Sequence, residues 1–197
     1  MVHALGVTDI AAPYRSYAEL EEGLGEVLRS PADLGTVELI VRRPAVDERE
    51  VLDAGTLDPD WGLVGDSWRE RHNRLSPDGS PDVEKQLNVI NARLSRLIAI
   101  EPDRRPLSGD QLHLDLDLST ANLPVGTRLA LGGAVIEVTA KPHKGCHKFT
   151  ARFGGDAMRF VNSPKGRDLR LRGLNARVVV AGTVRPGDQV RKLGTRP

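Results

Sequence analysis

A run of alternating leucines restricts the fold of this chain more than any other feature. Every second residue from Leu112 to Leu118 is leucine, and the three residues between them are polar. A period of two predicts a half-buried strand. Further on, the segments 127–131 and 134–140 flank Gly132-Gly133, a pair that favours a tight hairpin turn. This part of the chain therefore predicts β structure.

The remaining segments add a few helices and more strands. Apolar residues at helical spacing predict helices over 16–29, 86–99 and 150–161. Branched or apolar runs bounded by Gly and Pro predict strands over 36–42, 177–181 and 189–193. Residues 44–82 are rich in turn residues and predict loops. Many short strands with few helices predict a mainly β fold, a barrel with peripheral helices.

Composition excludes several classes of protein. The chain has 197 residues, which fits one domain. Lys and Arg total 28 and Asp and Glu total 27, so no general attraction to nucleic acid or acidic membranes is expected. A single cysteine forms no internal disulfide, and the first residues lack a signal-peptide pattern. We therefore expect a soluble, cytoplasmic protein.

Positive charge is concentrated in one stretch of this balanced chain. Residues 141–172 carry nine Lys and Arg against two acids, Asp156 and Asp168. Such a patch is typical either of a site for a small anionic ligand or of a solvated surface that binds nothing. Charge alone favours the second interpretation.

The only cysteine lies inside this basic stretch. Cys146 follows Pro142 and Gly145 and directly precedes the helix predicted from residue 150. Lys144, Lys148 and the start of a helix all favour the thiolate, which attacks sulfur and binds metals. The alternative is an inert cysteine that acts as a small apolar side chain.

A zinc site is a weaker alternative. His143, Cys146 and His147 could supply three ligands, but a structural zinc commonly takes four from paired motifs. The nearest further candidate is His113, and nothing in the sequence indicates that it lies close by.

Four short motifs occur in a characteristic order. They are GLVGD at 62–66, LSGD at 107–110, PHKGCHKF at 142–149 and the segment 172–188, which has the pattern G…RV…G.V..GD. In order and spacing they resemble the MOSC domain family, the C-terminal module of molybdenum cofactor sulfurases. The resemblance covers residues 35–193. It implies a twisted, pyruvate-kinase-like β-barrel over 35–197, with 1–34 as an N-terminal helical extension.

The resemblance also implies a chemistry for Cys146. In such a protein the cysteine either binds molybdenum of a pterin cofactor or carries sulfur as a persulfide. Related enzymes with the cofactor reduce N-hydroxylated compounds. Basic and loop residues are candidates for contact with the cofactor: Lys144, Lys148, Arg152, Arg172, Asn175 and Gly109.

Two departures from the family leave the activity open. The 197 residues contain no pyridoxal-phosphate domain, so sulfur would be exchanged with a partner, a cysteine desulfurase or a molybdoenzyme, that acts as donor or acceptor. His-Lys-Gly precedes Cys146, whereas reductase-type members commonly have Pro-Cys, which puts reductase activity in doubt. A non-catalytic module that binds a small anion or a partner is the remaining alternative. The oligomeric state is not predicted.

Overall fold

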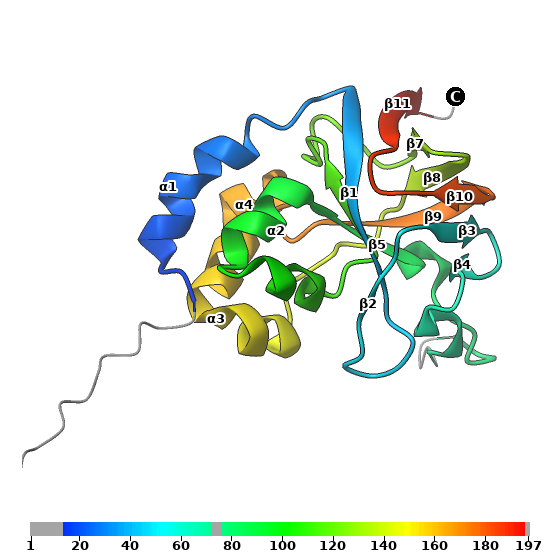
Figure 1. Ribbon diagram of the computed structural model, residues 1–197, viewed down its shortest axis with the longest axis horizontal. Coiled ribbons are helices and arrows are strands. Elements are labelled where there is room, and N and C mark those ends of the chain that lie inside the picture. The colour runs from blue at the N-terminus through cyan, green and yellow to red at the C-terminus, as the bar shows by residue number, and fades with distance from the viewer. Residues whose placement is uncertain (1–13, 72–75, 196–197) are drawn as a thin grey trace, which may run out of the picture.

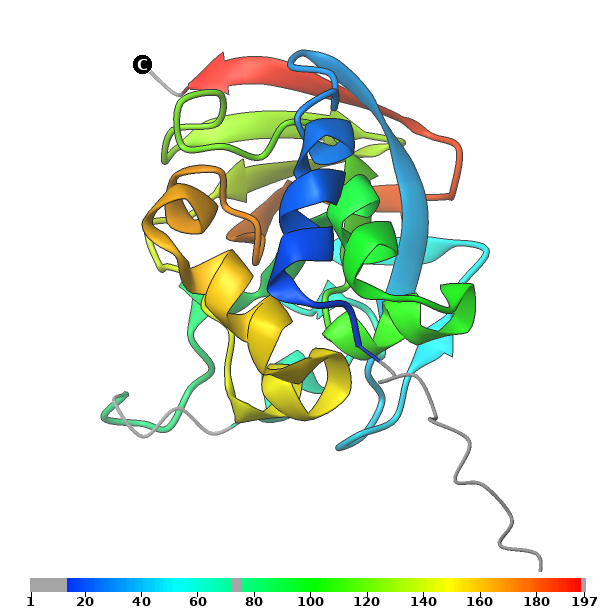
Figure 2. The same cartoon turned by 90° about the vertical axis from the view of Figure 1, so that its left-hand side faces the viewer.

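The computed structural model describes residues 14–71 and 76–195. Within them, a closed β-barrel carries helices along one side (Figure 1). The view turned by 90° shows three helices in front of the barrel: α1 (Tyr17–Val27), α2 (Ala92–Ile98) and α3 (His147–Asn162) (Figure 2). A mainly β fold with peripheral helices is therefore confirmed. Residues 1–13 of the predicted N-terminal extension lie outside the described residues.

Seven strands form the barrel, in the order β11-β7-β8-β9-β5-β6-β1. The barrel closes where β1 pairs with β11, and β5 and β6 form a parallel pair in an otherwise antiparallel sheet. The hairpin predicted at Gly132-Gly133 joins β7 to β8. The strand bounds are β1 Leu34–Arg42, β5 Leu87–Asn91, β6 Leu112–Asp115, β7 Thr127–Leu131, β8 Ala134–Val138, β9 Leu174–Val180 and β11 Gln189–Thr195.

Short strands occupy part of the region for which the sequence predicts only loops. β2, Glu50–Val51, pairs with the end of β1. A second sheet contains β3 (Gly55–Asp58), β4 (Gly62–Leu63) and β10 (Gly182–Val184). Strands of two to four residues are too short to show a period, and β3 depends on a partner that is distant in sequence.

The helix predicted over 86–99 is wrong in its first half. Residues Leu87–Asn91 form β5, and α2 covers only Ala92–Ile98. Leu87 faces the barrel interior, whereas Ile90 packs among the helices. Because both faces of β5 are buried, its apolar residues do not alternate, and their spacing imitates that of a helix.

The strand at the alternating leucines is buried on both sides, not half-buried. Its leucines belong to the core inside the barrel. His113, on the opposite face of β6, is fully buried beneath α2, where its Nδ1 lies 3.0 Å from Ser95 Oγ. A polar residue with one ring nitrogen bonded to a neighbouring helix, and the other buried without a partner among the described residues, thus occupies a position that the sequence pattern assigns to solvent.

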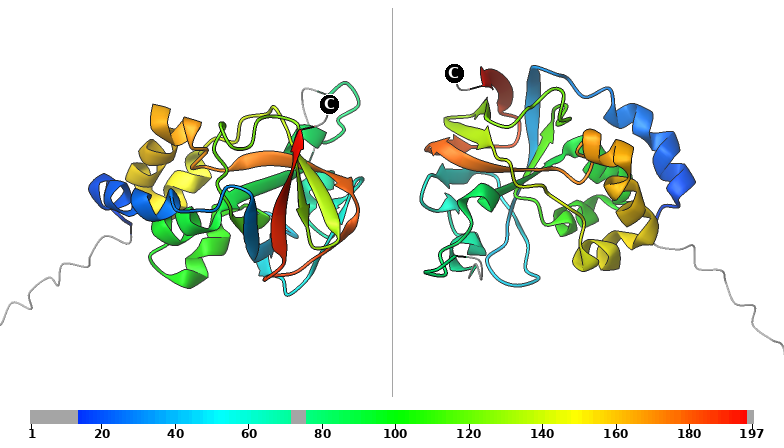
Figure 3. Two further views of the ribbon diagram at one scale, coloured as in Figure 1. Left: turned by 90° about the horizontal axis from the view of Figure 1, so that it is seen from above. Right: turned by 180° about the vertical axis from the view of Figure 1, so that it is seen from behind.

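Helices α1, α2 and α3 build a second core on the outside of the barrel. α1 covers Tyr17–Val27 and begins with a capping box at Ser16. α3 covers His147–Asn162, and the short α4 covers Pro164–Asp168. Apolar residues of α1, α2 and α3 pack together against Ile90 of the barrel wall. The views from above and behind show that the chain crosses from β8 to α3 at the junction of the two layers (Figure 3).

In the part of the chain that the structure describes, no helix has the length and apolar character needed to cross a bilayer.

Candidate functional site

Cys146 lies at the N-cap of α3, as the sequence predicts, and its side chain is exposed. The backbone N–H of Gly145 donates to Asn162 Oδ1 at 3.3 Å. A Cβ on Gly145 would come within 2.5 Å of Met158 Sδ, so any larger residue here would require the Met158 side chain to move. The sulfur is therefore presented at a helix N-terminus, where backbone N–H groups favour negative charge.

An open pocket of about 660 Å³ has Cys146 on its wall. This volume lies within the range of small-molecule sites. Its lining also includes two acids, Asp47 and Glu70. Six cationic side chains line it: Arg43, Arg49, Arg71, Lys148, Arg152 and Arg172. Such an excess of positive charge would favour an anionic ligand over a cationic one.

The structure gathers most of the predicted site residues at this pocket. Cys146, Lys148, Arg152, Arg172 and Gly109 all line it. Lys144 and Asn175 instead line a neighbouring pocket of about 420 Å³. The two pockets adjoin, because both include Arg71 and Asn88 in their lining.

A buried charge network holds the cysteine loop to the barrel. Asp110, at the start of β6, is fully buried. Arg172 Nη1 donates to both of its carboxylate oxygens, at 2.9 and 2.8 Å. His143 Nε2 lies 2.7 Å from Asp110 Oδ1. Arg172 also stacks on the ring of Phe149, 4.9 Å from its centroid, and so links the network to the first turn of α3.

The network fixes the protonation of its members. Burial disfavours the charge on Asp110, but Arg172 and the hydrogen bond from His143 hold the pKa of its carboxyl well below the usual range. Burial, together with the charge of Arg172, lowers the pKa of His143. At neutral pH Asp110 is ionised and His143 is neutral, which fixes the proton of His143 on Nε2, where it donates to the carboxylate.

Three pocket arginines were not predicted: Arg43, Arg49 and Arg71. Arg43 is buried and forms a two-pronged ion pair with Asp66. Arg49 and Arg71 form no ion pair within residues 14–71 and 76–195. Burial and the neighbouring arginines lower the pKa of both, that of Arg71 to about 10. No periodic pattern marks these residues, since they lie on irregular segments that meet only in the fold.

Asp47 provides a negative charge at the mouth of this pocket. Its Oδ1 accepts from Arg152 Nη2 at 2.6 Å and from Lys148 Nζ at 3.2 Å. It has a φ of 64°, a left-handed conformation that is uncommon for a residue other than glycine. The carboxylate therefore neutralises Lys148 and Arg152, two cations that would otherwise face an anionic ligand.

The zinc alternative finds no support in the described residues. Among them, no three His, Cys, Asp or Glu side chains come together as a metal-binding group. His143 is instead engaged with Asp110, and Cys146 remains exposed.

Comparisons with known proteins agree with this architecture. The sequence model of the MOSC domain matches residues 84–191. The crystal structure of the YuaD protein from Bacillus subtilis superposes with a TM-score of 0.58 at 16% identity, over 80% of this chain and 94% of that one. YiiM from Escherichia coli gives 0.53 at 17% identity, over 82% and 71%. No curated protein sequence matches the chain significantly.

Proposed function

The chain belongs to the MOSC domain family, and we propose that it binds an anionic molybdenum-pterin cofactor in the pocket of Cys146, with the thiolate as a ligand of molybdenum. One observation carries this proposal. The exposed sulfur, at a helix N-terminus, shares a pocket of about 660 Å³ with six Arg and Lys side chains. A thiolate is a suitable ligand for a transition metal, and the cations suit the phosphate of the cofactor.

The donor set of the pocket fits such a group. Buried polar atoms normally have partners, yet the Nε atoms of Arg49 and Arg172 are buried without one in this structure. Gly109 has a φ of 83°, and a Cβ there would approach Arg49 Nη2 to 3.5 Å. The absent side chain leaves room for a ligand beside the arginines.

The residues at the pocket have distinct roles in this proposal. Lys148 and Arg152 bind the anionic portion of the ligand once it displaces the Asp47 carboxylate from them, and the start of α3 favours Cys146 as the thiolate. The Asp110–His143–Arg172 network keeps the loop in place. When bound, the cofactor supplies two-electron redox chemistry.

Metal analysis tests the proposal. The protein is expressed in a host that makes the cofactor, and molybdenum is measured per chain. We expect nearly stoichiometric molybdenum in the wild type and a large loss in Cys146→Ser and in Arg152→Gln. Arg185→Gln, which removes an exposed charge away from this pocket, is the matched control and should retain the metal. Equal molybdenum in all four proteins, or none in any, would refute the proposal.

Exposure of Cys146 favours a second function, that of a sulfur carrier. The Cys146 thiolate attacks the outer sulfur of a persulfide on a partner, such as a cysteine desulfurase. A new S–S bond forms on Cys146 while the S–S bond of the donor breaks, and the donor leaves as a thiolate. Delivery repeats the exchange: a thiolate of a molybdoenzyme attacks the outer sulfur, the S–S bond on Cys146 breaks, and Cys146 leaves as the thiolate. No net oxidation occurs, so the step needs no further reactant.

Labelled sulfur distinguishes the two functions. Molybdenum-free protein that takes up the label from a desulfurase, with loss of uptake in Cys146→Ser, would favour the carrier. If the wild type and Cys146→Ser behave alike in both assays, the cysteine is inert. The chain is then a module that binds a small anion or a partner.

A further inference from the structure

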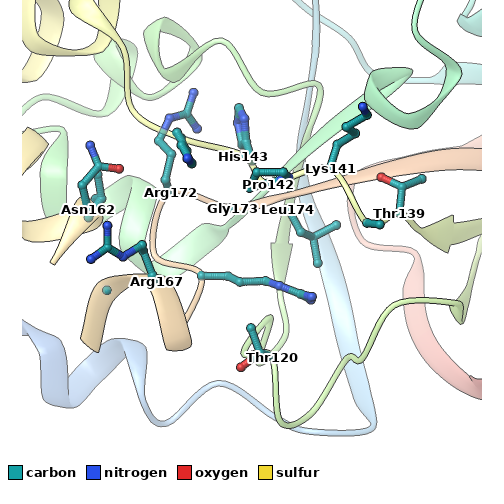
Figure 4. Close-up of a pocket in the computed structure, with 15 residues that line it drawn as sticks. Thr120, Thr139, Lys141, Pro142, His143, Asn162, Arg167, Arg172, Gly173 and Leu174 are labelled. Carbon is teal, nitrogen blue, oxygen red and sulfur yellow. The ribbon is translucent and has the colours of Figure 1, made fainter. Parts of the chain in front are cut away.

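A second cavity adjoins the segment that leads from β8 to Cys146. Its volume is about 240 Å³, which liquid water would fill with about eight molecules. Residues 139–144, the loop 170–174 and Thr120 contribute to its wall, whereas Cys146 does not. Figure 4 shows Asn162, Arg167 and Arg172 on one side of this cavity, and Thr139 and Lys141 on the other. The phosphate site proposed above does not require it.

Positive charge also dominates this cavity, and no Asp or Glu lines it. Its cationic residues are Lys141, Lys144, Arg167, Arg170 and Arg172. Asp110 neutralises Arg172, and Lys141 lies within 4.0 Å of Asp82 and 3.8 Å of Glu84. The three other cations form no ion pair within the described part of the chain.

Arg170 is the least compensated of these three. Its Nη1 donates to two backbone carbonyls, that of Leu123 at 2.6 Å and that of Leu118 at 3.5 Å. Burial lowers its pKa, and no neighbouring carboxylate offsets that loss. Its φ of 47° places it in the left-handed region, and the N–H of Gly173 donates to its carbonyl at 2.7 Å. The fold thus holds a partly desolvated guanidinium without a counter-charge, which is costly unless an anion binds.

The side chains of Lys144 and Arg167 complete the arrangement. Neither forms a hydrogen bond or an ion pair with any residue in 14–71 or 76–195, so both are available to a ligand. The hydroxyl of Thr120 is also at the wall, where it donates to the carbonyl of Asp168 at 3.1 Å and keeps its lone pairs free. Two guanidinium groups and an ammonium suit the tetrahedral oxygens of a small anion.

We propose that this cavity is a second binding site, for a small oxyanion of the phosphate or sulfate class. The ligand contacts Lys144, which lies two residues before Cys146, and so touches the cysteine loop. The shared chemistry is a tetrahedral dianion, either free or as the end group of a phosphomonoester.

Calorimetric titration of molybdenum-free protein with inorganic phosphate tests the site at constant ionic strength. We expect saturable binding that weakens at least about tenfold in Lys144→Gln/Arg167→Gln. The matched control is Arg185→Gln/Arg191→Gln, which removes two exposed cations outside both pockets and should change the affinity less than about twofold. Glycerol phosphate in place of phosphate shows whether the site accepts an ester.

Hydrogen exchange locates the bound phosphate. Protection is expected in residues 164–174, whether or not residues 43–49, which border the pocket of Cys146, are protected as well. Absence of saturable binding, an equal loss of affinity in both double variants, or protection confined to 43–49 would each overturn the proposal. Because Lys144→Gln/Arg167→Gln leaves all six cations of the Cys146 pocket in place, failure of this proposal is distinguishable from failure of the proposed cofactor function.

Discussion

Replacement of Arg172 by methionine should reveal how strongly the buried charges hold the cysteine loop. Asp110 is fully buried and Arg172 is 6% exposed, so the variant leaves a buried carboxylate without its main partner. Removal of one member of a buried ion pair costs about 3–5 kcal/mol. We expect a loss of this size in the free energy of unfolding near pH 8, measured by urea unfolding.

The same variant should change how stability depends on pH. Burial is the largest cause of the lowered pKa of His143, and the charge of Arg172 is the second. Without Arg172, the pKa of His143 rises relative to that in the wild type. A folded-state pKa below the ordinary 6.5 costs stability as the pH falls below 6.5, so the wild type loses more stability on acidification than the variant does. The loss should therefore be smaller near pH 5.5 than near pH 8.

A double variant separates charge from packing. In Asp110→Asn/Arg172→Met no buried charge remains unpaired, so most of the lost stability should return. A loss below about 1 kcal/mol for Arg172→Met near pH 8 would contradict this account of the network. A loss that is the same near pH 5.5 and near pH 8 would contradict the role given to His143.

Three further perturbations test other parts of the structure. Burial lowers the pKa of His113 from 6.5 to about 4, so wild-type stability should fall by about 3 kcal/mol as the pH drops through that range. This pH-dependent loss should be absent when the free energy of unfolding of His113→Asn is measured against pH. The same loss in the variant would contradict the role given to His113. Gly173 has a φ of 105° and a Cβ there would lie 2.2 Å from a backbone oxygen, so Gly173→Ala should cost at least about 2 kcal/mol in urea. Gly126→Ala, with a φ of 85° but open space around it, should cost only about 1 kcal/mol, and similar losses for both would exclude the steric explanation. Asp47→Asn keeps a residue type that tolerates left-handed backbone and removes the charge at the pocket mouth, so Cys146 should react about two- to fivefold faster with anionic iodoacetate but equally fast with neutral iodoacetamide. If both reagents respond alike, Asp47 does not act through its charge.

Local sequence patterns correctly predicted turns and helix starts, but not elements whose surroundings come from distant parts of the chain. The hairpin at Gly132-Gly133 and the helix predicted from residue 16 were correct, because each depends on residues that are close together in sequence. β5 was predicted as helix because the helices cover its outer face, which the sequence cannot show locally. His113 was assigned to solvent for the same reason, and Ser95 of α2 supplies its partner.

Local sequence rules predicted the candidate site only around its cysteine, whereas Gly109 and Arg172 were identified through the family resemblance. Gly145, Cys146 and the basic residues after them are contiguous in sequence, so their local geometry followed from turn and helix-capping rules. Arg49 and Arg71 reach the pocket from irregular segments that are distant from Cys146 in sequence, and only the folded chain brings them there. Spacing along a chain contains no such information.

Intact-protein mass spectrometry tests most directly whether Cys146 is the functional centre. The protein is purified without reductant and compared, under native and denaturing conditions, with Cys146→Ser. We expect the wild type alone to retain the mass of a molybdenum-pterin cofactor in native spectra, or the mass of an added sulfur after denaturation. Identical spectra for the two proteins, apart from the substitution itself, would contradict this role of Cys146.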